Sequence, residues 1–321
     1  MTTRAPESRG VEPRVDVSVL VPARDEADNL PEFLSLCARA FAGRDERYEV
    51  IVVDDGSTDA TPTLLPELAA QFPFVKSVRH RSARGIADAL RSGYLVARGN
   101  VLVFYPADLQ FLPEDIPRLA APVLAGTADM VTGRKEGKYD KAFVSGVYNG
   151  LSRLLFDVPV RDLNNVKAYR REIMEVQPAR PDWHRYMIVL AAAQGFSVME
   201  IPVALYPRRA GKSKFGVSRI PIGVLDMLSV WFELRFARKP LLMFGMLGAG
   251  MFLVAAIAGV VLLTTGLGTR PLWAIVQTAL TLGSVFFATG LLGEQVAALR
   301  AEQQELRRRL DDQSGGRAAG D

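Results

Sequence analysis

The sequence predicts an α/β domain with a mostly parallel sheet, followed by an interfacial helix, a two-helix transmembrane hairpin and a C-terminal helix. Two observations predict this architecture. Through residues 15–135, short apolar runs rich in Val and Ile alternate with helical patterns, an order typical of parallel strands covered by helices on both faces. Residues 240–293 are then nearly free of charge. The 321 residues, 49% of them hydrophobic, are enough for one sizeable domain and a further region.

The predicted elements follow one another in a regular order. Five apolar runs are predicted as strands: Val15–Pro22, Tyr48–Asp54, Val75–Arg79, Val101–Tyr105 and Ala128–Thr132. Four helices are predicted between them: Leu30–Phe41, Thr61–Gln71, Ile86–Ala97 and Pro113–Ala125. Because the carboxyl ends of parallel strands lie at one edge of the sheet, we expect ligands to bind beyond those ends.

Two uncharged runs, Leu241–Thr264 and Leu272–Leu292, are long enough to cross a membrane, which takes about 20 residues. The link GLGTRP is too short for a domain, so both ends of the pair should lie on one side. Basic residues flank the pair outside the link: Arg235, Arg238, Lys239, Arg300, Arg307, Arg308 and Arg309. Because positive residues favour the cytoplasm, the catalytic domain and both termini are expected there. A buried core hairpin is the alternative, and two consecutive uncharged runs argue against it.

Composition excludes several classes of protein. The net charge of +4, without a long basic run that contains aromatics, does not indicate binding to nucleic acid. The single cysteine, Cys37, excludes an internal disulfide and fits a reducing compartment; we expect it to be buried on the first helix. The first fourteen residues lack the apolar core of a signal peptide and are predicted as a disordered arm. The only histidines, His80 and His184, are expected to be structural.

Polar segments follow three of the predicted strands. These segments are Pro22–Glu26 (PARDE), Asp54–Asp59 (DDGSTD) and Pro106–Gln110 (PADLQ). An Asp-Asp-Gly turn alone could be only a helix cap, but three acidic strand ends at one edge indicate a binding site. The first strand is followed by no glycine, whereas a dinucleotide-binding G-x-G-x-x-G loop needs three. Hydride-transfer chemistry is therefore not expected.

Read in order, VSVLVPARDEADNL, VIVVDDGSTDAT and VLVFYPADLQFLPEDI resemble family 2 glycosyltransferases of GT-A fold. Within that family the likeness is to the dolichol-phosphate mannosyltransferase and bacterial polyprenyl-phosphate glycosyltransferase branch. Three later segments agree with this branch: TGRK at 132–135, VRDLNNVKAYRRE, and RRAGKSKFG at 208–216. Each segment alone is a weak match, but the ordered set, covering roughly residues 15–240, is specific.

The resemblance implies an inverting transfer of a hexose from a UDP- or GDP-linked sugar to polyprenyl phosphate at the cytoplasmic membrane face. The partners are then a nucleotide-sugar donor, a polyprenyl phosphate acceptor and the membrane. Two alternatives stay open. A processive polysaccharide synthase normally carries Q-x-x-R-W, and the segment from Gln177 to Pro181 (QPARP) lacks the tryptophan. A non-catalytic scaffold that binds the nucleotide-sugar or the lipid is the other alternative.

The resemblance also assigns roles to residues. The nucleotide-sugar would be held by Pro22, Arg24, Glu26, Asp54, Asp55 and Ala107. The residues expected in catalysis are Asp108, Arg134, Arg208 and Lys214. The acceptor phosphate would be bound by Arg134, Arg208, Ser213 and Lys214, although a solvated or headgroup-binding patch is the plainer interpretation of this basic set. Asp108 and Gln110 would bind a divalent metal, Mg²⁺ or Mn²⁺.

The chain departs from the family in its metal motif. The family has D-A-D-L-Q, and Pro106 replaces the first aspartate. Proline has neither a side-chain ligand nor a backbone N–H. The substitution is therefore expected to weaken metal binding or to shift it onto Asp108, Gln110 and water.

The predicted domain boundaries follow from these segments. The ranges are 1–14 for the arm, 15–217 for the catalytic domain, 218–239 for an amphipathic interfacial helix, 240–293 for the hairpin, 294–312 for the C-terminal helix and 313–321 for a disordered tail. The interfacial helix combines apolar residues with Trp231, Arg219 and Arg235; a plain core helix is its alternative. In the C-terminal helix, residues with a three-four spacing form a heptad seam that predicts a homo-oligomer: Val296, Leu299, Gln303, Leu306 and Leu310.

Overall fold

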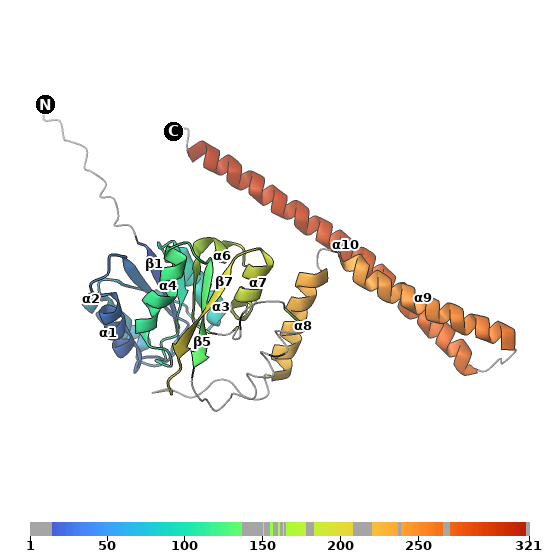
Figure 1. Cartoon of the computed structure of the whole chain (residues 1–321), viewed down its shortest axis with the longest axis horizontal. Coiled ribbons are helices and arrows are strands. Elements are labelled where there is room, and N and C mark those ends of the chain that lie inside the picture. Colours follow the sequence, from blue (N-terminus) through green and yellow to red (C-terminus); the bar gives the residue numbers. More distant parts are fainter. Residues whose placement is uncertain are drawn as a thin grey trace. The chain divides into compact units, whose positions relative to one another are not determined.

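The computed structural model of the chain consists of two compact units, residues 1–220 and 221–321 (Figure 1). The structure describes residues 15–136, 150, 155–156, 160, 163, 165–177, 183–207, 220–236, 239–265 and 270–318. The first unit is an α/β domain, and the second is built from three helices.

A seven-stranded sheet forms the centre of the first unit, with the strand order β3-β2-β1-β4-β6-β5-β7. The strands are β1 Val17–Ala23, β2 Tyr48–Asp54, β3 Val75–Arg79, β4 Val101–Phe104, β5 Met130–Glu136, β6 Lys167–Arg170 and β7 Val198–Ala204. Neighbouring strands pair in parallel except at β6, which is antiparallel to both β4 and β5. The other six strands therefore share one direction, as the mostly parallel prediction requires.

Helices cover both faces of this sheet. The helices of the first unit are α1 Leu30–Phe41, α2 Thr61–Gln71, α3 Ile86–Val96, α4 Ile116–Leu124, α6 Arg171–Glu175 and α7 Met187–Ala193, with short 3₁₀ turns at Pro113–Asp115 and Trp183–Arg185. α1 and α4 pack in one core cluster with alternate residues of β1. On the opposite face, Gly93 of α3 approaches Leu20 of β1 and Val53 of β2 so closely that an added Cβ would lie 3.2 Å from each side chain.

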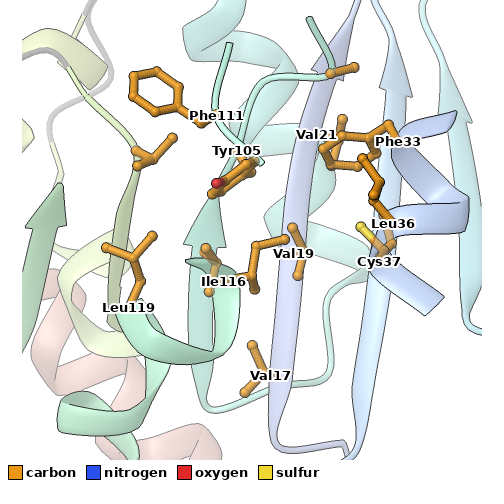
Figure 2. Close-up of a cluster of buried hydrophobic side chains, with 14 of the residues drawn as sticks. Val17, Val19, Val21, Phe33, Leu36, Cys37, Tyr105, Phe111, Ile116 and Leu119 are labelled. Carbon is orange, nitrogen blue, oxygen red and sulfur yellow. The ribbon is translucent and has the colours of Figure 1, made fainter. Parts of the chain in front are cut away.

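The main core lies between β1 and the helices α1 and α4 (Figure 2). Because side chains alternate along a strand, Val17, Val19 and Val21 all point into this cluster. Phe33 and Cys37 come from α1, where apolar residues recur every three or four positions. Cys37 is completely buried, which confirms its predicted place, and burial raises the pKa of its thiol.

The predicted elements of the first unit are present, with small shifts at their ends. Four of them have the predicted boundaries: Leu30–Phe41, Tyr48–Asp54, Thr61–Gln71 and Val75–Arg79. The helix predicted over 113–125 begins as a 3₁₀ turn. The sequence analysis predicted neither β7, which pairs with β5 at the end of the sheet, nor β6. The larger change in topology comes from β6, which separates β4 from β5. Its four residues are too few to show a strand pattern.

The second unit contains α8 Ile220–Phe236, α9 Pro240–Thr265 and α10 Arg270–Ala318. α9 and α10 form a close hairpin, in which a Cβ on Gly248 would lie 3.0 Å from the carbonyl oxygen of Gly283. Within the described residues, these two helices are long and apolar enough to span a membrane, as expected of a membrane protein. α10 continues without a break through 294–312 and into the segment predicted as a tail.

Candidate active site

The carboxyl ends of β1, β2, β3 and β4 meet at one edge of the sheet, because these strands are parallel neighbours. The chain runs outward from β1 to β3 and then crosses back to place β4 on the other side of β1. Ligands in open α/β sheets bind at such a reversal of strand order. The three polar segments predicted from the sequence follow β1, β2 and β4 and thus lie at this edge.

The loops after β1 and β2 are joined by hydrogen bonds. The backbone N–H of Asp25 donates to Ser57 Oγ at 2.9 Å, and the Asp25 carboxylate accepts from the Thr58 N–H at 2.8 Å. The N–H of Glu26 donates to Thr61 Oγ1 at 3.0 Å. Asp25 has φ of 56°, in the left-handed region that residues other than glycine seldom adopt. These bonds from the second loop hold Asp25 in that conformation.

The nucleotide-binding residues predicted after β1 occupy different environments. Pro22 is half-buried near the end of the strand, and Arg24 is exposed with its Nε 3.9 Å from Asp25 Oδ2. Glu26 accepts a hydrogen bond from Asn29 Nδ2 at 2.7 Å, at the start of α1. Arg24 is therefore the most accessible of the three to a ligand.

Asp54 is completely buried at the end of β2. Its Oδ1 accepts from the Ser57 N–H at 2.8 Å. Its Oδ2 lies 3.3 Å from Arg79 Nε, but that contact lacks hydrogen-bond alignment, and Oδ2 accepts no hydrogen bond within the described residues. The Arg79 side chain is 64% exposed.

Asp55 connects the end of β2 to the loop after β3. Its Oδ1 accepts from the Arg84 N–H and from His80 Nδ1, and its Oδ2 accepts from the Gly85 N–H, each at 2.8 Å. His80 is 5% exposed, and its Nε2 lies 2.9 Å from Ser92 Oγ in α3. The three bonds to one carboxylate fix residues 80–85 beside the other loops of this edge.

The sequence-based interpretation missed this role of His80 and of residues 80–85. The available signal was position: His80 directly follows β3, whose carboxyl end lies at the same edge as the other three. Loop 80–85 also covers Gly56, which has φ of 69°. A Cβ at Gly56 would lie 2.6 Å from the backbone nitrogen of Ala83, so this turn accepts no side chain.

The hydrogen bonds around Asp55 also set its charge. Burial raises the pKa of this carboxyl. The hydrogen bonds from Arg84, His80 and Gly85 together lower the pKa by more than burial raises it, so that it falls below the ordinary value. Asp55 is therefore ionised at neutral pH and acts as an acceptor only.

The loop after β4 holds the two predicted metal ligands, Asp108 and Gln110. The Gln110 N–H donates to Asp108 Oδ1 at 3.2 Å, and the Gln110 carbonyl accepts from the Tyr206 N–H at 2.9 Å. Leu109, between them, has φ of 56° and is buried. Backbone strain of this kind is concentrated at functional sites. Ala107 is buried and lines the base of the loop.

The donors in this loop fit a divalent ion that keeps other ligands. A carboxylate and a side-chain amide oxygen are hard oxygen ligands. Pro106 adds none, and the described part of the chain contains no group of three or more His, Cys, Asp or Glu residues placed to hold a metal. Asp108 and Gln110 can therefore supply part of a coordination shell that water and a diphosphate complete.

The predicted acceptor residues are only partly described. Arg134 lies in β5, and its Nη2 is 3.1 Å from Glu136 Oε1, with both side chains partly exposed. Arg208, Ser213 and Lys214 lie outside the described residues. His184 is buried, and its pKa is lowered to about 3 by burial and then by the nearby Lys167 and Arg185 charges. It is therefore neutral, which agrees with the structural role expected for it.

Comparisons with known proteins agree with this fold. Residues 18–166 match the model of glycosyl transferase family 2. The dodecaprenyl-phosphate galacturonate synthase of Rhizobium johnstonii is 30% identical over 301 residues, which cover 88% of each chain. The undecaprenyl-phosphate 4-deoxy-4-formamido-L-arabinose transferase of Klebsiella pneumoniae is 28% identical over 295 residues, again 88% of each chain.

A solved structure shows the same fold. Glucosyl-3-phosphoglycerate synthase from Mycobacterium tuberculosis, in complex with Mn²⁺, uridine diphosphate and glucosyl-3-phosphoglycerate, matches with a TM-score of 0.54 at 17% identity. The match covers 68% of this chain and 80% of that one. The α/β unit is thus a GT-A fold, and the protein is a glycosyltransferase. The chain belongs to glycosyltransferase family 2.

Proposed function

We propose that this glycosyltransferase transfers a hexose from a UDP- or GDP-linked donor to polyprenyl phosphate at the cytoplasmic face of a membrane. The observation that carries the proposal is the extent of the match to two relatives whose names specify dodecaprenyl and undecaprenyl phosphate. Each aligns over 88% of this chain, whereas the α/β unit ends at residue 220 of 321. The likeness therefore includes part of the helical unit.

The loops at the carboxyl edge would bind the donor. The residues that we assign to the nucleotide-sugar are Pro22, Arg24, Glu26, Asp54, Asp55 and Ala107. Carboxylates at this edge accept hydrogen bonds from base N–H groups and ribose hydroxyls. Asp54 Oδ2, which accepts no hydrogen bond within the described residues, is the best placed to accept one. Arg24 supplies positive charge near the phosphates.

Asp108 and Gln110 would hold Mg²⁺ or Mn²⁺. A bound ion of this kind neutralises the charge that develops on the leaving nucleoside diphosphate. Because only one carboxylate remains in the motif, the site should depend strongly on Asp108. The solved relative in fold contains Mn²⁺ and uridine diphosphate together.

The acceptor phosphate would be the nucleophile. One of its oxygens forms a bond to the anomeric carbon while the bond from that carbon to the nucleoside diphosphate breaks, and this single displacement inverts the anomeric centre. A phosphate monoester, with a second pKa of about 6, is largely dianionic near neutrality, so positioning matters more than a general base. Arg134 would help to position it: its exposed pair with Glu136 is weak and can give way to phosphate. Arg208, Ser213 and Lys214 complete the assigned set.

The helical unit would anchor the enzyme. α9 and α10 would cross the membrane as a hairpin, with α8 lying in the headgroup region. The basic residues that flank the hairpin support a cytoplasmic location for the α/β unit and both termini. We also propose that the chain is a homo-oligomer.

Membranes that contain the full chain, assayed with a panel of nucleotide-sugars and with polyprenyl phosphate, test the proposal. The expected product is a polyprenyl monophosphate sugar. A polymer would instead indicate a processive synthase, and donor binding without turnover a scaffold.

The role of Asp108 is tested in the same assay. Asp108→Asn should lower divalent-dependent transfer by roughly 100-fold or more, since it removes the remaining carboxylate that supports charge on the leaving group. Glu114→Gln, which alters an exposed acid in the following turn, is the matched control and should leave the rate unchanged. An Asp108→Asn variant with the wild-type rate at ordinary Mg²⁺ would show that the metal assignment is wrong.

A further inference from the structure

One face of α10 carries exposed residues at an alternating spacing of three and four along most of the helix. We name this set the outer seam: Ile275, Thr278, Leu282, Val285, Thr289, Leu292, Val296, Leu299, Gln303 and Leu306. Every member is exposed. α9 instead contacts another face of α10, which includes Ala279, Gly283 and Gly290. Ile275, Thr278 and Leu282 line an open cavity beside Met251 of α9, so the part of the outer seam that α9 leaves uncovered begins at Val285.

The hairpin also ends well before the seam does. A Cβ on Gly293 would lie 2.8 Å from Pro240, the first residue of α9, and the N–H of Leu241 donates to Glu294 Oε2 at 3.4 Å. Beyond Glu294, α10 therefore continues past the start of α9, as the red end of the helix in Figure 1 shows. This extension reaches Ala318.

The solvent around the seam changes at this level. Up to Leu292 lipid tails can cover apolar side chains, since lipid is as apolar as leucine. The membrane anchoring proposed above, on which this inference rests, leaves the charge-rich part of α10 past Glu294 in water. Val296, Leu299 and Leu306 are nevertheless 50–60% exposed there. Apolar residues in a regular row on a water-facing helix indicate a protein partner.

We propose that the outer seam beyond Glu294 pairs with the same seam of a second copy as a parallel, in-register, two-stranded coiled coil. Val296 and Gln303 then occupy a positions, and Leu299 and Leu306 occupy d positions. A β-branched residue at a with leucine at d favours two parallel strands, and one polar a residue fixes the register. All copies enter the membrane in the same orientation, so their α10 helices are parallel from the outset.

Charges beside the seam favour the parallel arrangement. In a parallel in-register pair, a g residue faces the e residue five positions later in the partner. Glu302 at g then faces the partner's Arg307 at e, and Gln295 at g faces the partner's Arg300 at e. In an antiparallel pair, e residues face each other and arginines would meet. The parallel form thus pairs one acidic g residue, Glu302, with an arginine and keeps the arginines at e apart.

Anchoring in the membrane offsets the short length of the coiled coil. The water-exposed part of the seam covers little more than two heptads. A tethered partner is present at a high effective concentration, which converts weak pairing into stable association.

Site-specific disulfide formation tests the proposal in native membranes of the full chain. The only native cysteine, Cys37, is completely buried and provides a silent background. Leu299→Cys and Leu306→Cys place thiols at d, and Ala301→Cys, at an exposed f position, is the matched control. Under mild oxidation we expect both d variants to form covalent dimers at least about fivefold faster than Ala301→Cys. Equal rates at the three positions would indicate random collision and overturn the proposal.

Co-expression of the two d variants separates parallel from antiparallel pairing. Disulfides between residues of the same number are expected; a preference for the mixed 299–306 disulfide would exclude the in-register arrangement.

Charge reversal provides a second test. Glu302→Arg should slow cross-linking of Leu299→Cys, and adding Arg307→Glu should restore it. If the double variant stays slow, the proposed g–e pairing is wrong. None of these measurements depends on transferase activity.

Discussion

The α/β unit and the helical unit place their apolar residues in opposite ways. In the α/β unit, valines such as Val19 and Val52 are completely buried. In the helical unit, Leu253 and Leu263 are 61% and 84% exposed. Both follow one rule, that apolar surface avoids water, in two different solvents. Apolar exposure would be a defect in the first unit, and in the membrane proposed for the second unit it is a requirement.

Polar groups follow the same division. In the α/β unit, side chains of separate loops bond to one another across the sequence, as Asp55 does with the backbone of Arg84 and Gly85. In the helical unit, the hydroxyls of Thr281 and Thr289 donate to carbonyls four residues earlier in their own helix. Within lipid, polar groups must be satisfied locally. The first unit can therefore build a site from distant segments.

Glycines provide the most sensitive test of close packing in the α/β unit. Gly56 and Gly43 have φ of 69° and 70°, so alanine at either is strained by about 1 kcal/mol or more. A Cβ on Gly56 would lie 2.6 Å from the backbone nitrogen of Ala83, whereas nothing lies within 4 Å of a Cβ on Gly43. Gly56→Ala should therefore lower the free energy of unfolding by roughly 2 kcal/mol more than Gly43→Ala. Thermal inactivation of the full chain in detergent measures both; equal losses would mean that loop 80–85 does not press on Gly56.

The His80 contacts are expected to matter somewhat less. His80→Leu removes a donor from Asp55 and leaves the Ser92 hydroxyl without its buried partner, at a loss of about 1–3 kcal/mol. The KM for the nucleotide-sugar should rise more than kcat falls, because loop 80–85 borders the proposed donor site. His80→Asn can keep a donor near Asp55 and should recover most of the KM. Ser92→Ala is the milder control.

The pH dependence of stability distinguishes the His80–Asp55 hydrogen bond from ordinary packing. The pKa of Asp55 is lowered in the folded chain, so its bonds stabilise the fold above the ordinary carboxyl pKa and are lost as pH falls through the folded value. The difference in unfolding free energy between wild type and His80→Leu should therefore shrink below about pH 4. A difference that is constant with pH would assign His80 to packing alone.

The smallest effect is expected in the helical unit. A Cβ on Gly283 would lie 2.9 Å from the ring of Phe252, a side chain that can move. A Cβ on Gly250 would have no atom of the described α10 residues within 4 Å. Gly283→Val should weaken the α9–α10 hairpin by about 1 kcal/mol relative to Gly250→Val. Protease sensitivity of the purified chain in graded detergent compares the two. If Gly250→Val is the weaker variant, the observed helix contact is wrong.

The sequence was sufficient for much of the fold, because local patterns determine its strands and helices. The strand Tyr48–Asp54 is predicted from a continuous run of apolar residues. The helix Leu30–Phe41 is predicted from apolar residues spaced three and four positions apart. β6 could not be predicted, since Lys167–Arg170 becomes a strand only by insertion between β4 and β5. That pairing depends on contacts with Val101 and Met130, far away in the chain. Non-local pairing of this kind leaves no periodic trace.

The candidate site was predictable to the level of its segments. The sequence predicted that the strand ends which carry Asp54, Asp55 and Asp108 share one edge of the sheet, and the strand order agrees with this. What the sequence could not show is how each carboxylate is used: Asp55 secures a loop, while Asp108 accepts from the N–H of Gln110. The sequence shows that a carboxylate is present and can accept hydrogen bonds. The fold determines which donors lie close enough to bond to it.

The unbroken course of α10 has a mechanical consequence. With its first part in the proposed membrane, the continuous helix α10 would act as a lever that pivots within the bilayer. Its arm beyond Glu294 is about 36 Å long at 1.5 Å per residue, so that a change in tilt of about 10° moves its tip by roughly 6 Å. Tilt responds to bilayer thickness. In the membrane proposed for this chain, a change in bilayer thickness that tilts α10 would therefore displace the end of this arm by several ångströms.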